Sequence, residues 1–176
     1  MKEYNIDLYA KNIEGLSDVT KYLVGEGFDI GCGTRRAHPD IKTVDRQPDK
    51  RYADADIVYD CKDLECFEPS SLDFIFSSHC LEDFDNIPKV FGDWFNRLKK
   101  GGVIVLLLPD METKRENGNT RYPRIEDGGN PSHKTNVGPI WFRAMLEKSG
   151  LDYEILQINT VAQHTSSFDV VIKRAA

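Results

Sequence analysis

Short apolar runs, each stopped by a glycine or an acid, recur along most of the chain. They read GFDIG (27–31), IKTVD (41–45), ADIVYD (55–60), SLDFIFSSH (71–79) and VIVLLLPD (103–110). Continuous apolar runs of this length, bounded by residues that break regular structure, are typical of strands buried on both faces. Two later runs, YEILQIN (153–159) and SSFDVVIKR (166–174), predict a terminal pair of strands.

Other stretches repeat apolar residues at helical spacing. One apolar face is formed by Ile87, Val90, Phe91, Trp94, Phe95 and Leu98. Asp85 and Asn86 are candidate caps before this helix, and the sequence KKGG (99–102) predicts its basic last turn and its end. A second helix is predicted at PIWFRAMLEKSG (139–150), and LSDVTKYLVGEG (16–27) predicts a short one.

This alternation predicts an α/β domain over residues 1–176, with a mainly parallel sheet and helices on both faces. Residues 110–139 interrupt the pattern, because they show no periodicity and are rich in Gly, Asn, Pro and charge. A connection of that length predicts either a lid over a site or a mobile insertion.

Composition narrows the function classes. The 176 residues carry a formal net charge of -6, which argues against a duplex DNA partner. No apolar run is long enough for a membrane span, and the N-terminus lacks the apolar core of a signal peptide. The four cysteines have no zinc-like spacing with the histidines, so we expect reduced thiols, no metal and a cytoplasmic location.

The sequence DIGCGT (29–34) predicts a glycine turn directly after the first strand. Gly31 and Gly33 would let the backbone approach a ligand, with N–H groups able to hold a carboxylate or phosphate. A dinucleotide fingerprint needs a third glycine where this chain has Arg36, and no P-loop sequence is present. The alternative is a plain tight turn that needs glycine only for its dihedral angles.

Acids follow the next two predicted strands. Asp45 is placed to accept hydrogen bonds from two ribose hydroxyls, and Asp60 to accept one from an amino group. Either acid could instead be an ordinary turn or cap residue. Because the carboxyl ends of parallel strands meet at one edge of a sheet, we expect both acids to lie beside the glycine turn.

Four segments in order carry a family resemblance. DIGCGT, TVD, YDCKDLECFEPSSLDFIFSSHCLEDF and FNRLKKGGVIVLLLPD together resemble the class I S-adenosylmethionine-dependent methyltransferases, and most of all their small "methyltransferase type 11"-like group. The resemblance implies a Rossmann-like three-layer sandwich on a seven-stranded sheet whose C-terminal strand is antiparallel. It also implies S-adenosylmethionine as cofactor.

By this resemblance, the cofactor would lie along the carboxyl edge of the sheet. Asp29 and the backbone of Gly31, Cys32 and Gly33 would face its methionine end. The ribose and the adjacent adenine face would be held by Asp45 with Arg46.

The resemblance places the adenine and the floor of the site further along the chain. Asp60 would hold the adenine amino group, with the backbone of Cys61 and Lys62 beside the ring. The floor near the sulfonium would be lined by Ser77, Ser78 and His79.

Some positions depart from the family pattern. Arg35 replaces the family's third glycine, and the short TRRAHPD connection (34–40) leaves room for only about one turn of the usual first helix. Asp83 stands where the family usually has histidine. These departures keep open a second interpretation, a non-catalytic cofactor-binding or assembly protein on a methyltransferase fold.

Candidate catalytic bases are His79, on the expected floor, and His133, after the long connection; for each, a structural role is the alternative. We expect a small-molecule or glycan-type acceptor, with arginines of residues 110–139 meeting an anionic group. The alternative for that segment is a solvated loop of mixed charge. Nucleic-acid amino-methylation is disfavoured, because SSHC (77–80) replaces the motif it requires.

Overall fold

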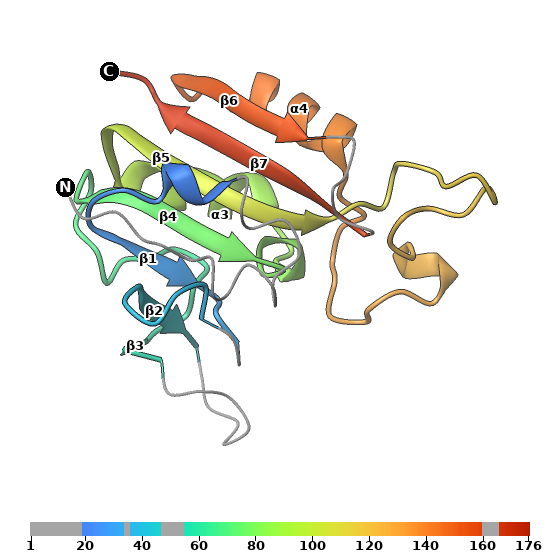
Figure 1. Cartoon of the computed structure of the whole chain (residues 1–176), viewed down its shortest axis with the longest axis horizontal. Helices are drawn as coiled ribbons and strands as arrows, with labels where there is room; N and C mark the ends of the chain where they lie inside the picture. The colour runs from blue at the N-terminus through green and yellow to red at the C-terminus, as the bar shows by residue number, and fades with distance from the viewer. Residues whose placement is uncertain (1–18, 34–35, 47–54, 160–165) are drawn as a thin grey trace.

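A seven-stranded sheet forms the centre of the molecule in the computed structural model, which describes residues 19–33, 36–46, 55–159 and 166–176 (Figure 1). The strands are β1 (Gly27–Ile30), β2 (Lys42–Asp45), β3 (Ile57–Val58), β4 (Leu72–Ser78), β5 (Leu98–Pro109), β6 (Tyr153–Asn159) and β7 (Ser167–Arg174). Their order is β3-β2-β1-β4-β5-β7-β6. Strands β1 to β5 pair in parallel, whereas β7 is antiparallel to both β5 and β6. This arrangement confirms the predicted sheet.

The register of the central strands brings their carboxyl ends together. Ile30, the last residue of β1, pairs with Val44 on one side and with Ser77 on the other. The residues that follow these strands therefore share one edge of the sheet. In Figure 1 the arrowheads of β4 and β5 point toward the side where residues 110–138 extend beyond the sheet.

One face of the sheet is covered by the two α-helices, α3 (Ile87–Arg97) and α4 (Pro139–Lys148). Asn86 caps α3 as expected, because its side chain accepts a hydrogen bond from the Lys89 N–H at 3.2 Å. The helices meet through Phe91 and Phe142, whose rings stack edge to face with centroids 5.6 Å apart. Both amphipathic patterns therefore bury their apolar sides in one core.

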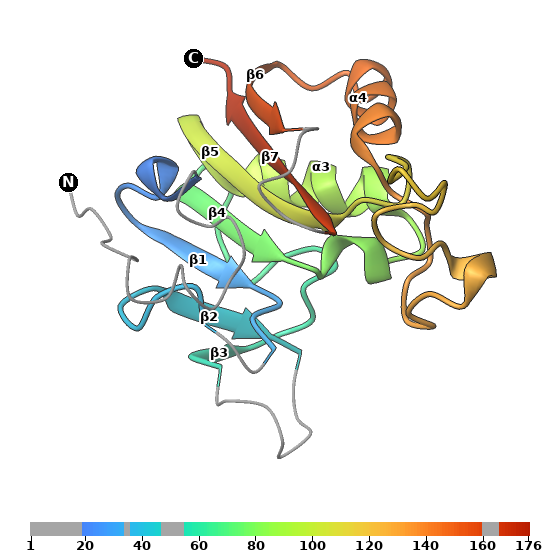
Figure 2. The same ribbon diagram turned by 45° about the vertical axis from the view of Figure 1, so that its right-hand side comes forward.

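The opposite face is covered by short segments in the part of the chain that the structure describes. Val19 and Leu23 flank a 3-10 turn, η1 (Thr20–Tyr22), and pack with Ala37 and Ile41 of the β1–β2 connection over the sheet. Figure 2 shows η1 and α3 on opposite sides of β4 and β5. The described residues 31–33 and 36–41 form no α-helix, and Arg35 lies outside the described residues.

The predicted end of helix α3 was wrong. The helix ends at Arg97, and Lys99 to Gly102 belong to β5 rather than to a last helical turn. The change occurs because Leu98 adopts extended dihedrals and pairs with Leu72 of β4. Gly102 does not end the helix but allows close packing of the backbone, since a Cβ there would lie 2.9–3.1 Å from backbone oxygens.

Residues 110–138 are anchored where they leave and rejoin the core. The Met111 N–H donates to the Val137 carbonyl at 3.0 Å. The Glu112 carboxylate accepts from the N–H groups of Ile140 and Trp141, at 2.7 and 2.9 Å, in the first turn of α4. The base of this segment is therefore fixed, and its exposed outer part carries a 3-10 turn, η3 (Ile125–Asp127). None of the helices in the described ranges combines the length and apolarity that crossing a membrane requires.

Candidate functional site

The glycine turn after β1 is fixed by contacts from both neighbouring strands. Gly31 has a φ of 69° and Gly33 a φ of 54°, a region that favours glycine. The Gly31 N–H donates to the Val44 carbonyl at 2.8 Å. A Cβ at Gly31 would overlap the sulfur of Cys80, whereas none of the described atoms lies within 4 Å of a Cβ at Gly33. Among the described atoms, the turn is thus packed at its first glycine and open at its second.

Asp45 binds this turn from the end of β2. Its Oδ2 accepts a hydrogen bond from the Gly33 N–H at 2.9 Å, and the residue is half-buried. A carboxylate has lone pairs for about four hydrogen bonds, so the Gly33 contact does not by itself prevent Asp45 from accepting from hydroxyl donors. Arg46, which follows it, is exposed. The structure therefore joins the two strongest sequence features, the glycine turn and the acid after the second strand.

Asp29 lies beneath the turn rather than on its surface. It is 1% exposed, and its Oδ2 accepts from the Ala37 N–H at 2.8 Å. Burial raises the pKa of this carboxyl to about 7; the nearby charge of Asp45 also raises it, whereas the Ala37 hydrogen bond and Arg36 lower it. Asp29 thus fastens the connection to the sheet.

Cys32 offers only its backbone to a ligand. Its side chain is buried, and burial, followed by the charge of Asp29, raises the pKa of the thiol to about 12. All four cysteines are free thiols, as expected.

Asp60 is placed on an exposed turn two residues beyond β3. Its Oδ1 accepts from the Lys62 N–H at 3.1 Å, and its Oδ2 lies 3.8 Å from the Lys62 Nζ. Cys61 is buried, and its carbonyl accepts from the Nε1–H of Trp94 in α3. The turn is thereby held against the core while the Asp60 carboxylate remains in solvent.

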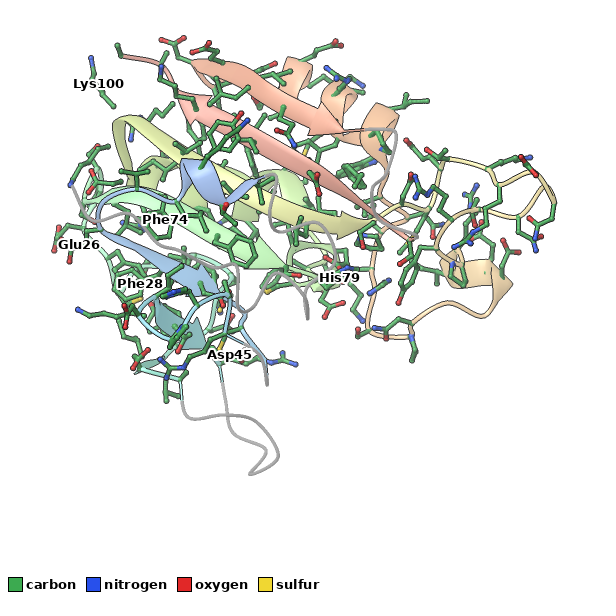
Figure 3. All side chains as sticks on the ribbon, in the orientation of Figure 1. Glu26, Phe28, Asp45, Phe74, His79 and Lys100 are labelled. Atoms are coloured by element: carbon green, nitrogen blue, oxygen red, sulfur yellow. The ribbon has the colours of Figure 1, made fainter. Side chains whose placement is uncertain are left out.

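The end of β4 brings three predicted residues to the same edge. Ser77 is buried and its hydroxyl donates to the Ile30 carbonyl at 2.8 Å, so it joins β4 to β1. Ser78 is half-buried and pairs with Leu107 of β5. His79 has a positive φ of 53°, and its N–H donates to the Leu107 carbonyl at 2.9 Å. Figure 3 shows Asp45 and His79 at the same end of the sheet.

The two candidate bases converge on a residue that sequence reasoning missed. Glu82, in the 3-10 turn η2 (Leu81–Asp83), is fully buried, and its Oε1 lies 3.4 Å from His79 Nδ1 and 3.6 Å from His133 Nε2. The Tyr122 ring lies beside both imidazoles, with centroid distances of 6.2 and 5.4 Å. The hydroxyl oxygen of Ser167, the first residue of β7, lies 2.9 Å from His79 Nε2.

The spacing of three residues between His79 and Glu82 was the one available sequence signal for this cluster. Tyr122 and Ser167 gave none, because they are 43 and 88 positions from His79 along the chain. No group of three metal-ligating side chains with the geometry of a metal site occurs among the described residues.

Comparison with known proteins identifies the class. Residues 1–156 match the family model described as a methyltransferase domain. The chain therefore belongs to this family of methyltransferase domains, and its fold is that of the class I S-adenosylmethionine-dependent methyltransferases. No curated protein sequence matches the chain significantly.

Solved structures share the fold at low sequence identity. A Thermotoga maritima methyltransferase, described as a possible histamine N-methyltransferase, is 19% identical with a TM-score of 0.67, covering 93% of this chain and 89% of its own. A Haloferax volcanii methyltransferase in complex with its activator is 14% identical with a TM-score of 0.66, covering 97% and 94%. Phosphoethanolamine N-methyltransferase 2 of Haemonchus contortus, in complex with S-adenosyl-L-methionine, is 14% identical with a TM-score of 0.61, covering 92% and 52%.

The residues present fit the cofactor of this class in most respects. Among the described atoms none lies within 4 Å of a Cβ at Gly33, and this position is beside a carboxylate that accepts the Gly33 N–H and is of a type that also binds hydroxyl groups. Asp60 is exposed at the next strand end. Asp29 differs from expectation because its carboxylate is buried under the turn, which leaves the backbone of residues 31–33 to meet a ligand.

Proposed function

We propose that the protein is a cytoplasmic enzyme that transfers a methyl group from S-adenosylmethionine to a small-molecule or glycan-type acceptor. The observation that carries the proposal is the hydrogen bond from the Gly33 N–H to Asp45 Oδ2, at 2.9 Å. It fixes an open glycine turn and a hydroxyl-binding carboxylate at adjacent strand ends, where α/β folds bind nucleosides. When bound, the cofactor supplies an electrophilic methyl group on a sulfonium.

Each part of the cofactor is assigned to one strand end. The backbone of Gly31, Cys32 and Gly33 faces the methionine moiety, because glycine lets a ligand approach the main chain closely. The N–H groups of Gly31 and Gly33 already donate within the protein, so they fix the shape of the turn. Asp45, with Arg46 beside it, binds the ribose hydroxyls. This assignment is supported by the half-buried position of Asp45 at the end of β2.

The turn after β3 binds the adenine, and the end of β4 lies near the sulfonium. Asp60 accepts from the adenine amino group, with the backbone of Cys61 and Lys62 beside the ring. Ser77, Ser78 and His79 form the floor near the sulfonium. The packing of Cys80 against Gly31 supports this, because it joins the end of β4 to the glycine turn.

The acceptor meets the cofactor beneath residues 110–138, which act as a partial cover. The fixed base of this segment and its exposed outer part support this role. Arg124 contributes to an anion site by exchanging partners, since its Nε now pairs with Glu126 Oε1 at 2.6 Å in an exposed position. An exposed pair of this kind contributes little stability and can open for an anionic acceptor.

Calorimetric titration with S-adenosylmethionine and S-adenosylhomocysteine tests the cofactor site. We expect saturable binding that Asp45→Ala weakens by at least about 10-fold, because ribose hydrogen bonds to a carboxylate are lost. Asp45→Asn keeps an acceptor for the Gly33 N–H and should retain part of the affinity. Asp40→Asn, exposed on the same connection, is the matched control. Equal affinity in wild type and Asp45→Ala would contradict the assignment.

A non-catalytic cofactor-binding protein is the second candidate. It is favoured by the lack of an α-helix in the described part of the β1–β2 connection, which removes cover from the cofactor. A release assay for S-adenosylhomocysteine, with UDP-glucose, methyl glucoside and catechol as acceptors, separates the two. Product with one acceptor supports the enzyme, whereas saturable cofactor binding without product supports the second candidate.

A further inference from the structure

The carboxylate of Glu82 is in an unusual state for a buried group. The residue is fully buried, and neither of its oxygens has a hydrogen-bond partner within the described part of the chain. An isolated buried charge costs several kcal/mol, so such a group is kept where a neighbour can compensate it. Two imidazoles lie at ion-pair distance from the same oxygen, those of His79 and His133.

The two imidazoles have different surroundings. The side chain of His133 is 3% exposed, and its Nδ1 has no hydrogen-bond partner among the described residues. Next to it, the Lys134 N–H donates to the Glu82 carbonyl at 2.9 Å, which docks this part of the segment on η2. The side chain of His79 is instead 37% exposed. His133 therefore shields the Glu82 carboxylate from solvent, whereas the partly exposed His79 lies between the carboxylate and solvent.

The surroundings of His79 favour a proton on Nδ1. This nitrogen lies at ion-pair distance, 3.4 Å, from Glu82 Oε1, although no hydrogen bond joins them, and the partner at one imidazole nitrogen sets the tautomer. With the proton on Nδ1, the Nε2 lone pair is an acceptor, and it meets the Ser167 hydroxyl at 2.9 Å. Nε2 thus already holds a hydroxyl group. Catalytic hydrogen bonds that are long in a free enzyme commonly shorten when the site is filled, and the 3.4 Å contact to Glu82 fits this behaviour.

Tyr122 supports the same arrangement from residues 110–138. Burial, followed by the charges of Glu82 and Asp83, raises the pKa of its phenol, so the phenol stays protonated beside the two imidazoles. Asp83 is a second acid facing the cluster, with Oδ1 3.9 Å from His133 Nε2, and it also accepts from the Ser132 hydroxyl at 2.9 Å. Asp83 already has a hydrogen bond, which leaves Glu82 as the carboxylate that needs the histidines.

Resting on the methyltransferase function proposed above, we propose that Glu82 is a positioning residue that holds His79 as the base for a hydroxyl acceptor. The acceptor hydroxyl replaces Ser167 at Nε2. Its oxygen–hydrogen bond breaks, the proton goes to Nε2, and the oxygen bonds the methyl carbon while the cofactor sulfur keeps the electron pair of the broken bond. The imidazolium stays paired with Glu82 and later returns its proton to water. A hydroxyl needs such a base, because it is a weak nucleophile until it loses its proton.

Imidazole nitrogen NMR of the protein without any ligand tests this positioning. In protein labelled with ¹⁵N in its histidines, we expect wild-type His79 to carry its proton on Nδ1. Glu82→Met removes the acceptor and should shift His79 toward the Nε2-protonated form. Glu82→Gln keeps an acceptor oxygen and should retain the wild-type form. Asp83→Asn, in the same turn, is the control and should change nothing at His79.

The wild-type spectrum decides the matter even if Glu82→Met does not fold, since a proton on Nε2 of His79 would overturn the proposal. An unchanged His79 in folded Glu82→Met would do the same. Because no cofactor is added, failure here is distinct from failure of cofactor binding. With an acceptor from the release assay, Glu82→Met should lower kcat about 100-fold with KM and cofactor affinity unchanged. Methylation of that acceptor at nitrogen or carbon would overturn the hydroxyl assignment.

Discussion

The two halves of the carboxyl edge use their acids in opposite ways. On the β1–β3 side, Asp29, Asp45 and Asp60 each accept a hydrogen bond from a backbone N–H in a nearby turn. Across β4, the buried Glu82 has no hydrogen-bond partner among the described residues and faces imidazoles instead. Backbone-bound acids rigidify turns and present a fixed surface to a ligand, whereas an acid that faces titratable groups can support proton transfer.

The difference also concerns distance along the chain. The acids of the first half bind N–H groups two to twelve positions away. His79 instead meets Ser167 at a separation of 88 positions, and Glu82 meets His133 from another segment of the fold. The first half is therefore a local construction, and the second depends on the completed sheet.

Gly31→Ala should cause the largest loss of stability and of cofactor binding, because it alters the turn of the first half. The positive φ costs about 1–2 kcal/mol for a residue with a Cβ, and overlap with Cys80 adds roughly 1–3 kcal/mol. We expect both a loss of unfolding free energy in denaturant titrations and loss of cofactor binding by calorimetry. The His79 NMR signals should report the damage as well, because Cys80 adjoins His79.

Gly33→Ala is the matched variant for that experiment. It shares the positive φ but meets open space among the described atoms, so its cost in unfolding free energy should be only about 1–2 kcal/mol. Equal destabilisation by the two substitutions would contradict the packing of Cys80 on the turn.

Asp29→Asn tests whether the acid under the turn is buried. The pKa of Asp29 is raised to about 7, so the folded state binds its proton more tightly than the unfolded state. The stability linked to that proton is fully present below the unfolded pKa near 4 and is lost as pH rises to about 7. Asparagine mimics the neutral carboxyl and removes this dependence. Between pH 5 and 8, wild type should lose roughly 2–3 kcal/mol more unfolding free energy than the variant.

Denaturant titrations at several pH values measure this difference, with Asp40→Asn as an exposed control on the same connection. Parallel pH profiles for wild type and Asp29→Asn would mean that the Asp29 carboxyl is solvated in the folded protein.

Ser132→Ala, in the half that contains Glu82, should cause the smallest change, a modest loss of local stability. The Ser132 hydroxyl donates to Asp83 at 2.9 Å in an exposed position, next to the Lys134 N–H that donates to Glu82. Losing one exposed hydrogen bond weakens this docking by about 0.5–1 kcal/mol, so exchange of the Lys134 amide should accelerate roughly 2- to 5-fold. Asn117→Ala, in the exposed outer part of the segment, is the control. An unchanged exchange rate would show that His133 alone anchors this part of the chain.

The sheet and its local turns could be predicted because their signals are short-range. The apolar runs located all seven strands, and the glycine pair and Asp45 marked the turn that the structure joins by a hydrogen bond. The end of α3 was misplaced, because pairing of Leu98 with β4 overrides the helical spacing that its side chain continues. Local propensity loses here to a tertiary contact.

The Glu82 cluster could be predicted only in part. His79 and His133 were candidates as single histidines, but their meeting at one carboxylate depends on how residues 110–138 fold back over η2. No spacing rule relates positions 82 and 133. A long connection without periodicity indicates a functional segment, and its partners follow from tertiary packing alone.

The insertion of β7 between β5 and β6 sets the order in which this molecule can be assembled during translation. Until β7 is synthesised, β5 has an unpaired edge and β6 has no neighbour in the sheet. Ser167, which begins β7, reaches His79 only when that strand inserts. A nascent chain can therefore form the glycine turn early, whereas the histidine cluster gains its last member only when the sheet closes.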